Sequence, residues 1–286
     1  MVILPTLSSL SFKTLQIFSH RWVKTLEITD CQPCKHLVRN FDLFIFIINV
    51  VFCINAILDK LSLIYKISGQ TGETKRDYYR ELTEERKIIV SDEDIKLAES
   101  LNAKQMEGFN EIFDHVMRNR GKVFFVDGPG GTGKTYLYRA LLARVRSTDR
   151  IAIATATSGI AASIMPGGRT AHLRFKIPIK LEDNSVCNFT KQSGTAELLR
   201  EASLIIWDEV AMTRRESVET LDRSLQDITG CDLPFGGKVI VFGGDFRQVL
   251  PVVTRGTRAQ ICDATLLRSY IWDNIKIVRL KQNMRA

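Results

Sequence analysis

The sequence has no regular spacing of cysteines. Its six cysteines, among 286 residues, lie at positions 31, 34, 53, 187, 231 and 262. That spacing argues against a disulfide framework and against a zinc finger, and it favours a reducing compartment. Cys31 and Cys34 form one C-x-x-C pair with His36 nearby. No second pair of ligands follows, and a structural zinc site takes about four. We therefore predict no metal centre built on cysteine.

Internal repeats and low-complexity tracts are also absent. The composition is that of an ordinary globular protein, with 45% hydrophobic and 25% charged residues. Lysine and arginine number 40 against 32 acidic residues, which gives a net charge of +8. A basic balance suits a partner that carries phosphates, although here the charge is spread along the chain.

Acidic residues are missing from the start of the chain until Glu27. This pattern resembles an organelle transit peptide, although arginine is scarce. Residues 43–58 are then apolar except for two asparagines. As a helix this run would reach about 24 Å, short of the roughly 30 Å hydrocarbon core of a membrane. A membrane span, a buried helix and non-native sequence from a misjudged gene start all remain open. We treat residues 1–68 as an N-terminal extension.

The rest of the chain divides into two parts. Residues 69–97 are dense in charges of both signs, which predicts a solvated linker or exposed helix. Residues 98–286 alternate short apolar runs with amphipathic segments. That alternation is typical of an α/β fold in which helices cover both faces of a parallel sheet.

A glycine-rich stretch, GPGGTGKT, occupies residues 128–135. It follows the apolar run 122–127, which suits a central strand, and precedes residues 134–146, which have helical spacing. Glycines here let backbone N–H groups turn inward around phosphates, and the helix N-terminus adds partial positive charge. We predict a P-loop nucleotide site in which Lys134 contacts the β- and γ-phosphates and Thr135 binds Mg²⁺. Its residues are Gly128, Pro129, Gly130, Gly131, Thr132, Gly133, Lys134 and Thr135.

Two acidic residues follow a second buried run. Leu204 to Trp207 are apolar, and Asp208 and Glu209 come directly after them. Ligands bind at the carboxyl ends of the strands in open parallel sheets. We therefore predict that Asp208 holds magnesium and that Glu209 polarises the attacking water, a pairing that favours hydrolysis.

A third apolar run ends at Gly243 and Gly244, and Asp245 and Gln248 follow it. An amide at this edge could bond the γ-phosphate or the attacking water. At this point the sequence resembles the PIF (petite integration frequency) family of DNA helicases, relatives of the RecD-like group. The motifs that carry the resemblance are GPGGTGKT, ATSGIAASIMPGGRTAH, IIWDEVAMTRR, GGDFRQVLPVV and RLKQNMR.

The resemblance implies a RecA-like ATPase lobe over residues 98–286 and ATP with Mg²⁺ as the ligands. It also implies movement from five-prime to three-prime on single-stranded DNA. By the same resemblance, Gln105 reads the adenine, Gln248 senses the γ-phosphate and Arg285 reaches the transferring phosphate. The implied partners are single strands and duplex junctions, and the implied role is genome maintenance, including DNA repair, recombination and telomere maintenance, in nucleus or mitochondrion.

The segment after the second strand is our predicted DNA track. Backbone N–H groups of Ser158 and Gly159 and the hydroxyls of Thr157 and Thr170 suit phosphate contacts. His172 and Phe175 could offer flat surfaces to bases. The family usually has serine where this chain has Leu173.

Helicases of this family use two RecA-like lobes, and this chain ends just after the first lobe's last motif. We expect the isolated chain to bind nucleotide weakly and to hydrolyse it far more slowly than a complete helicase. Two alternatives remain open. One is a non-motor remnant that binds nucleotide or DNA without unwinding, and the other is a RecA-like signalling ATPase.

Overall fold

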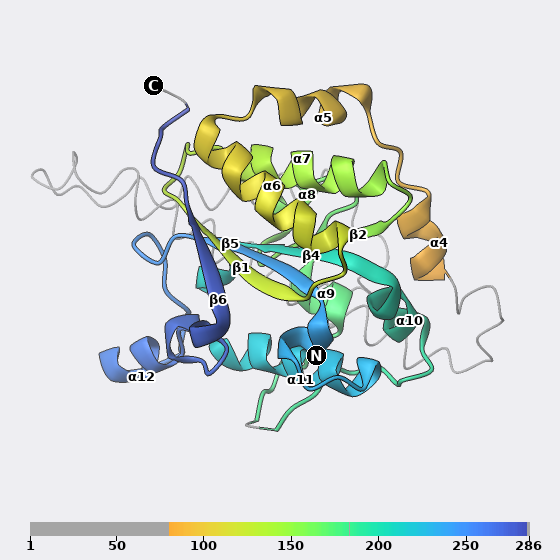
Figure 1. Ribbon diagram of the computed structural model, residues 1–286. Helices are drawn as coiled ribbons and strands as arrows, with labels where there is room; N and C mark the ends of the chain where they lie inside the picture. The colour runs from red at the N-terminus through yellow and green to blue at the C-terminus, as the bar shows by residue number, and fades with distance from the viewer. Residues whose placement is uncertain (1–79, 183, 285–286) are drawn as a thin grey trace, which may run out of the picture. The chain divides into compact units, whose positions relative to one another are not determined.

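A six-stranded parallel sheet forms the centre of the computed structural model, which describes residues 80–182 and 184–284 (Figure 1). The spatial order of the strands is β3-β2-β4-β5-β1-β6. Strands β1, β5 and β4 are neighbours, so their carboxyl ends meet at one edge of the sheet. The strands are β1 (Lys122–Asp127), β2 (Ile151–Ala156), β3 (Arg169–Thr170), β4 (Ala202–Asp208), β5 (Val239–Gly244) and β6 (Ile275–Arg279).

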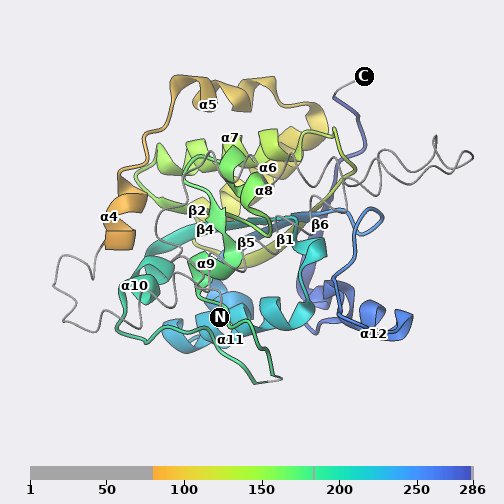
Figure 2. The same ribbon diagram turned by 180° about the vertical axis from the view of Figure 1, so that it is seen from behind.

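Helices cover both faces of this sheet, as Figures 1 and 2 show. On one face pack α6 (Ala103–Met117), α7 (Lys134–Arg146) and α8 (Gly159–Ile164). On the other pack α9 (Ala171–Phe175), α10 (Gly194–Glu201) and α11 (Arg215–Thr229). The remaining short elements after the first described helices are η3 (Leu97–Ser100), η4 (Val210–Met212), η5 (Pro234–Gly237), α12 (Arg258–Asp263), η6 (Leu266–Arg268) and η7 (Trp272–Asn274). The predicted α/β architecture is confirmed.

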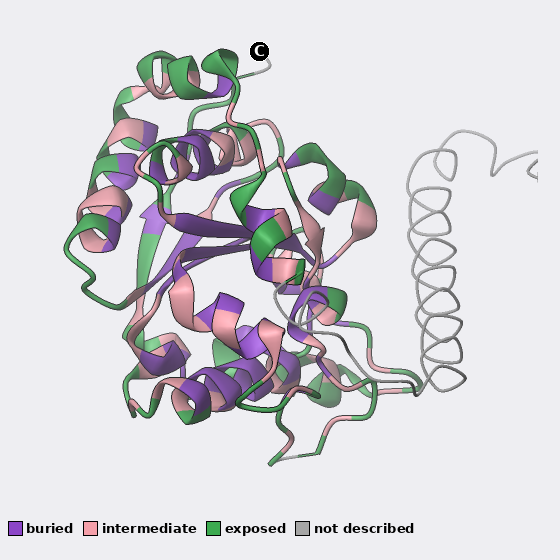
Figure 3. Cartoon of the chain, turned by 90° about the vertical axis from the view of Figure 1, so that its right-hand side faces the viewer, coloured by how far each residue is buried: buried purple, intermediate pink, exposed green. Residues whose placement is uncertain are grey.

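The central strands are buried along nearly their whole length (Figure 3). Because helices cover both faces, such strands need almost continuous apolar runs rather than alternating ones. The runs at 122–127 and 134–146 were expected to be a strand and a helix, and they coincide with β1 and α7. The loop between them therefore stands at the carboxyl edge of the sheet.

Two short helices precede α6: α4 (Arg80–Arg86) and α5 (Asp92–Lys96). Both belong to the same compact unit as the sheet. Leu82 and Glu85 of α4 are buried, and so is Asp94 of α5. In its described part, the segment expected to be a solvated linker or exposed helix thus forms two short, largely exposed helices that are anchored by these three buried side chains.

The physical reason is a set of ion pairs that are distant in sequence. The carboxylate of Glu85 pairs with Arg146 at the end of α7, at 3.0 Å, and with Arg174 in α9. All three side chains are almost completely buried. Burial lowers the pKa of Arg146 to about 10, and the negative charge of Asp94 partly offsets the effect. Burial also lowers the pKa of Arg174, against the opposing charges of Glu81 and Glu84. These ion pairs hold α4 against α7, on one face of the sheet, and against α9, on the other face.

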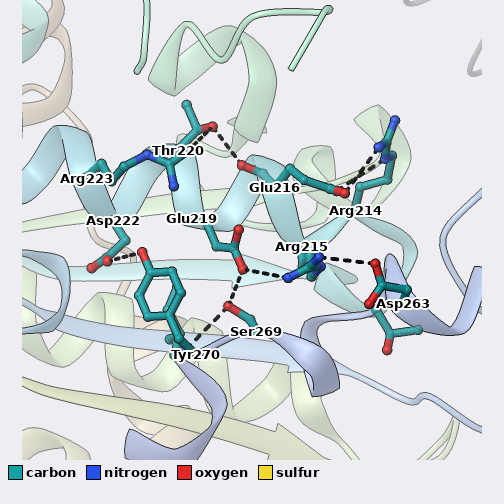
Figure 4. A network of polar contacts seen from close by, with 12 residues as sticks. Arg214, Arg215, Glu216, Glu219, Thr220, Asp222, Arg223, Asp263, Ser269 and Tyr270 are labelled. Atoms are coloured by element: carbon teal, nitrogen blue, oxygen red, sulfur yellow. Dashed lines mark hydrogen bonds and ion pairs between the residues drawn. The ribbon is translucent and has the colours of Figure 1, made fainter. Parts of the chain in front are cut away.

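A second polar network joins α11 to residues that precede and follow β5 in the sequence, and Figure 4 shows the part that involves Asp263, Ser269 and Tyr270. Asp222 accepts a hydrogen bond of 2.7 Å from the hydroxyl of Tyr270 and one of 2.5 Å from the backbone N–H of Phe235. Glu219 accepts a bond of 2.8 Å from Ser269. Burial and the neighbouring Asp222 raise the pKa of Tyr270. These contacts hold η5 and the turn between η6 and η7 against α11.

Two of the expected N-terminal features lie outside the described residues. They are the apolar run 43–58 and the group formed by Cys31, Cys34 and His36. Among the helices that the structure describes, none combines the length and apolar character needed to cross a bilayer. Within the same part of the chain, histidine, cysteine and acidic side chains nowhere gather in groups of three that could hold a metal.

Candidate functional site: a phosphate loop at the carboxyl edge

The loop 128–135 turns sharply between β1 and α7. Gly131 and Gly133 have φ angles of 89° and 77°, in the left-handed region where glycine is favoured. A Cβ on Gly133 would lie 2.3 Å from Nε2 of Gln105, so a side chain there would also clash. Thr132 is buried and its hydroxyl donates to the carbonyl of Pro129 at 2.8 Å. The local fold thus depends on small residues and brings the backbone close to its neighbours.

Lys134, the first residue of α7, folds its side chain over this loop. Its ammonium group donates to the carbonyls of Gly128 and Pro129, the latter at 3.3 Å. Burial lowers the pKa of Lys134, and the negative charge of Asp208 partly offsets the effect. The lysine therefore lies where a phosphate oxygen could replace its carbonyl partners.

Asp208 ends β4 on the other side of the same edge. Its Oδ1 accepts the backbone N–H of Glu209 at 2.9 Å. Burial raises the pKa of Asp208 to about 6, because a carboxylate loses hydration in the protein interior. Glu209 has a φ of 57° and turns its carboxylate toward Ser158, whose hydroxyl donates to Oε2 at 2.6 Å.

The turn after β5 adds a third group of polar side chains. Gln248 donates from Nε2 to Asp245 Oδ2 at 2.9 Å, and Arg247 donates from Nε to Asp245 Oδ1 at 2.7 Å. Burial alone would raise the pKa of Asp245, but the hydrogen bonds from Arg247 outweigh it and hold that pKa below its usual value. Arg247 also pairs with Asp127 at the end of β1, at 3.2 Å.

These three groups line one cavity of about 530 Å³. The structure thus brings together Lys134, Thr135, Asp208, Glu209 and Gln248, which lie far apart in the sequence. The same cavity has apolar walls that the sequence did not point to: Tyr136, Ile164, Met212, Val249 and Met284. Met284 is held there by its backbone N–H, which donates to the carbonyl of Gly131 at 2.8 Å.

Gln105 lies beside this loop and is completely buried. Its Oε1 accepts the backbone N–H of Asn102 at 2.9 Å, and the side chain of Asn102 accepts the N–H of Gln105 in return. Its Nε2 donates to the carbonyl of Thr132 at 3.0 Å. The Asn-x-x-Gln spacing is a capping-box signal that could have been found in the sequence. Adenine recognition by Gln105 stays a prediction.

The predicted DNA track is only partly exposed. Ser158 caps α8, Gly159 is its first residue, and Thr170 precedes α9. These three residues and His172 are half-buried at the surface. Leu173 is 49% exposed.

Two residues of that track are corrected by the structure. Phe175 is completely buried and packs against Trp207, with ring centroids 5.7 Å apart. The hydroxyl of Thr157 is also buried, donates to the carbonyl of Glu209 at 2.9 Å and accepts the indole N–H of Trp207 at 3.1 Å. Both side chains are used by the core, so neither is available to DNA in this structure. Arg285 lies outside the described residues.

A parallel sheet with a phosphate loop after β1 and an acidic pair after β4 defines a P-loop nucleoside triphosphatase of the RecA-like type. The family model described as "PIF1-like helicase" matches residues 100–286, roughly two thirds of the chain. The chain therefore belongs to the PIF1-like helicase family, which confirms the resemblance seen in its motifs.

Individual relatives agree with this assignment. The ATP-dependent DNA helicase Pif1 of Psychrobacter sp. (strain PRwf-1) is 30% identical over 167 residues, which cover 58% of this chain and 25% of that protein. The ATP-dependent DNA helicase RRM3 of Saccharomyces cerevisiae is 32% identical over 149 residues, which cover 50% of this chain and 20% of that protein. The chain thus spans a quarter or less of these relatives.

Solved structures show the same partial coverage. Bacteroides Pif1 bound to ssDNA superposes with a TM-score of 0.52 at 29% identity, covering 65% of this chain and 42% of that one. Bacteroides Pif1 in complex with ADP-AlF3 and ssDNA also gives 0.52, at 28% identity, covering 69% and 43%.

Proposed function

We propose that this chain is the first ATPase lobe of an ATP-dependent DNA helicase that moves from five-prime to three-prime along a single strand. The observation that carries the proposal is the cavity in which Lys134, Thr135, Asp208, Glu209 and Gln248 converge. Family membership supports the reaction class. The direction of movement rests on the resemblance alone.

The residues of the cavity fit Mg-ATP. The ammonium group of Lys134 lies over the loop and donates to the backbone carbonyls of Gly128 and Pro129. Phosphate oxygens could take the place of these two carbonyls. Asp208 is a buried carboxylate whose raised pKa reflects missing hydration, and a cation would relieve that cost. We propose that Thr135 and Asp208 hold magnesium, which when bound supplies positive charge beside the β- and γ-phosphates.

The chain's own residues would then divide the work of hydrolysis. Lys134 exchanges its carbonyl partners for phosphate oxygens and offsets the charge that develops on them. Glu209 orients the attacking water and accepts its proton. Gln248 leaves Asp245 to contact the γ-phosphate side of the cavity, and Arg285 provides a further cation by resemblance. Gln105 is proposed to contact adenine.

Single-stranded DNA and duplex junctions are the proposed macromolecular partners. In the solved relatives, Bacteroides Pif1 is bound to ssDNA. In this chain we assign the contacts to Ser158, Gly159, Thr170 and His172, which lie after β2 and around β3. By family resemblance we also propose a role in genome maintenance in the nucleus or mitochondrion.

ATP hydrolysis by the full chain, with and without single-stranded DNA, tests the proposal. We expect hydrolysis that rises with DNA and falls about 100-fold or more in Lys134→Ala, because a cation at the transferring phosphate is lost. Lys104→Ala is the matched control, since Lys104 is exposed and, among the residues that the structure describes, pairs with Glu107 on its own helix. Hydrolysis that ignores both DNA and Lys134→Ala would contradict the proposal. Hydrolysis that needs Lys134 but ignores DNA would favour a non-motor ATPase.

Direction can be tested with tailed duplexes. A five-prime single-stranded tail should support unwinding and a three-prime tail should not. Unwinding only from the three-prime tail would contradict the proposed direction while leaving the ATPase assignment intact.

A further inference from the structure

Tyr138 is one helical turn after Lys134 on α7, and its side chain is completely buried. Within the part of the chain that the structure describes, its hydroxyl has no hydrogen-bond partner. Buried polar groups nearly always have one, because the water they lose must be replaced. The unsatisfied hydroxyl therefore needs a physical explanation.

The hydroxyl lies next to the acid that ends β4. A Cβ on Gly243 would stand 1.9 Å from Oη of Tyr138 and 2.6 Å from Oδ1 of Asp208. Both oxygens thus lie against the same side of the Gly243 backbone. Because Gly243 has no side chain, no atom of Gly243 lies between Oη of Tyr138 and Oδ1 of Asp208.

The chemistry of the pair fixes which group donates. The phenol keeps its proton, and an ionised carboxylate can only accept. Oδ1 of Asp208 already accepts the N–H of Glu209 at 2.9 Å.

We propose that Tyr138 is a positioning residue whose hydroxyl donates to Oδ1 of Asp208 when a divalent metal is bound. This inference rests on the proposed function, in which Asp208 holds magnesium. With two donors on Oδ1, the second oxygen of the carboxylate is directed to the metal. Hydrogen bonds of catalytic groups are often long in unliganded proteins and tighten in the loaded state.

Removing the hydroxyl should therefore weaken metal binding. Partners behind a metal ligand orient it, and their loss typically costs about 10- to 100-fold in metal affinity. Tyr138→Phe keeps the ring that packs in the core and removes only the oxygen. We expect Mn²⁺ to bind the Tyr138→Phe protein with ADP about 10-fold more weakly, measured by electron paramagnetic resonance of free Mn²⁺. ADP affinity in EDTA should not change.

Two comparisons separate positioning from packing. Tyr270→Phe is the matched control, because it removes a hydroxyl bonded to Asp222 on a different part of the fold, and its Mn²⁺ affinity should equal that of the unchanged protein. In an Asp208→Asn background, Tyr138→Phe should have no further effect on Mn²⁺ affinity. A lower melting temperature of Tyr138→Phe with unchanged Mn²⁺ affinity would assign a packing role and overturn the inference.

The remaining outcomes distinguish this inference from the proposed function. If the unchanged protein binds ADP and Mn²⁺ and Tyr138→Phe binds both equally well, the positioning role is wrong and the nucleotide site stands. If the unchanged protein binds neither, the proposed function fails and the inference fails with it.

Discussion

Ser158 donates a hydrogen bond of 2.6 Å to Oε2 of Glu209. Ser158 begins the segment after β2, where we place DNA, and Glu209 follows β4, where we place the attacking water. Strands β2 and β4 are neighbours in the sheet. One hydroxyl therefore joins the proposed DNA track to the proposed catalytic base, Glu209.

We predict that Ser158→Ala weakens the dependence of ATP hydrolysis on DNA. Without the hydroxyl, the Glu209 carboxylate is free to face the cavity even when DNA is absent. A hydrogen bond to a charged group contributes about 1.5–3 kcal/mol, so the DNA-free rate should rise by roughly tenfold or more. The ratio of rates with and without oligo-dT measures the effect.

Ser163→Ala is the control for that variant. Ser163 lies on the same helix α8, and its hydroxyl donates to the backbone carbonyl of Ile160 within that helix. Its stimulation ratio should stay that of the unchanged protein. A Ser158→Ala protein that keeps the full ratio would show that this bond does not couple the two sites.

Glu85→Ala should destabilise the fold strongly. It leaves Arg146 and Arg174 buried without their acidic partner, and breaking a buried pair typically costs about 3–5 kcal/mol. Glu84→Ala removes pairs with Arg80 and Arg169 that are more exposed, so about 1 kcal/mol or less is expected. Urea unfolding of the two variants measures the difference, and equal losses would refute it.

Asp208 should make the metal-free protein less stable as pH rises. Its folded pKa of about 6 lies above its ordinary value of 3.8, so between these values the folded state binds more protons than the unfolded state. The cost of the buried charge is absent below the ordinary pKa and complete above about pH 6. It amounts to at most about 3 kcal/mol.

Asp208→Asn removes this cost. In EDTA, its free energy of unfolding relative to the unchanged protein should be more favourable at pH 8 than at pH 4.5. Loss of the negative charge beside Lys134 acts in the opposite sense and makes the gain in stability smaller than this limit. A stability difference that is the same at both pH values would argue against a raised pKa.

Phe175→Leu should lower stability without lowering the affinity for single-stranded DNA. The ring is fully buried against Trp207, and truncation of buried aromatic residues to alanine costs about 3–5 kcal/mol, so leucine should cost less. His172→Ala tests the half-buried neighbour in the same anisotropy titration. A Phe175→Leu protein that is fully stable but binds DNA weakly would restore the stacking role.

The phosphate loop and the acidic pair could be predicted because each follows an apolar strand. In both cases the local pattern predicts a buried strand and also the residue at which that strand ends. The burial of Phe175 could not be predicted in this way, since an aromatic residue at the end of a short helix has the same local pattern whether it faces solvent or Trp207. The burial of Gln105 has no local signal in hydrophobic periodicity, although its spacing to Asn102 contains a usable capping signal.

The charged stretch before residue 98 shows a different limit. Its acids suggest solvation as long as only sequence neighbours are considered. Glu85 is neutralised by Arg146 and Arg174, which are brought near only by the complete fold. Periodicity and composition contain no information on such pairing.

Helix α4 has a practical consequence for producing this protein. The family model starts at residue 100, yet two arginines inside it depend on Glu85 outside it. The segment recognised by homology is therefore smaller than the segment that folds as a unit. A recombinant fragment that begins at residue 100 should express poorly or aggregate, whereas one that retains residues 80–99 keeps the counter-ion its interior requires.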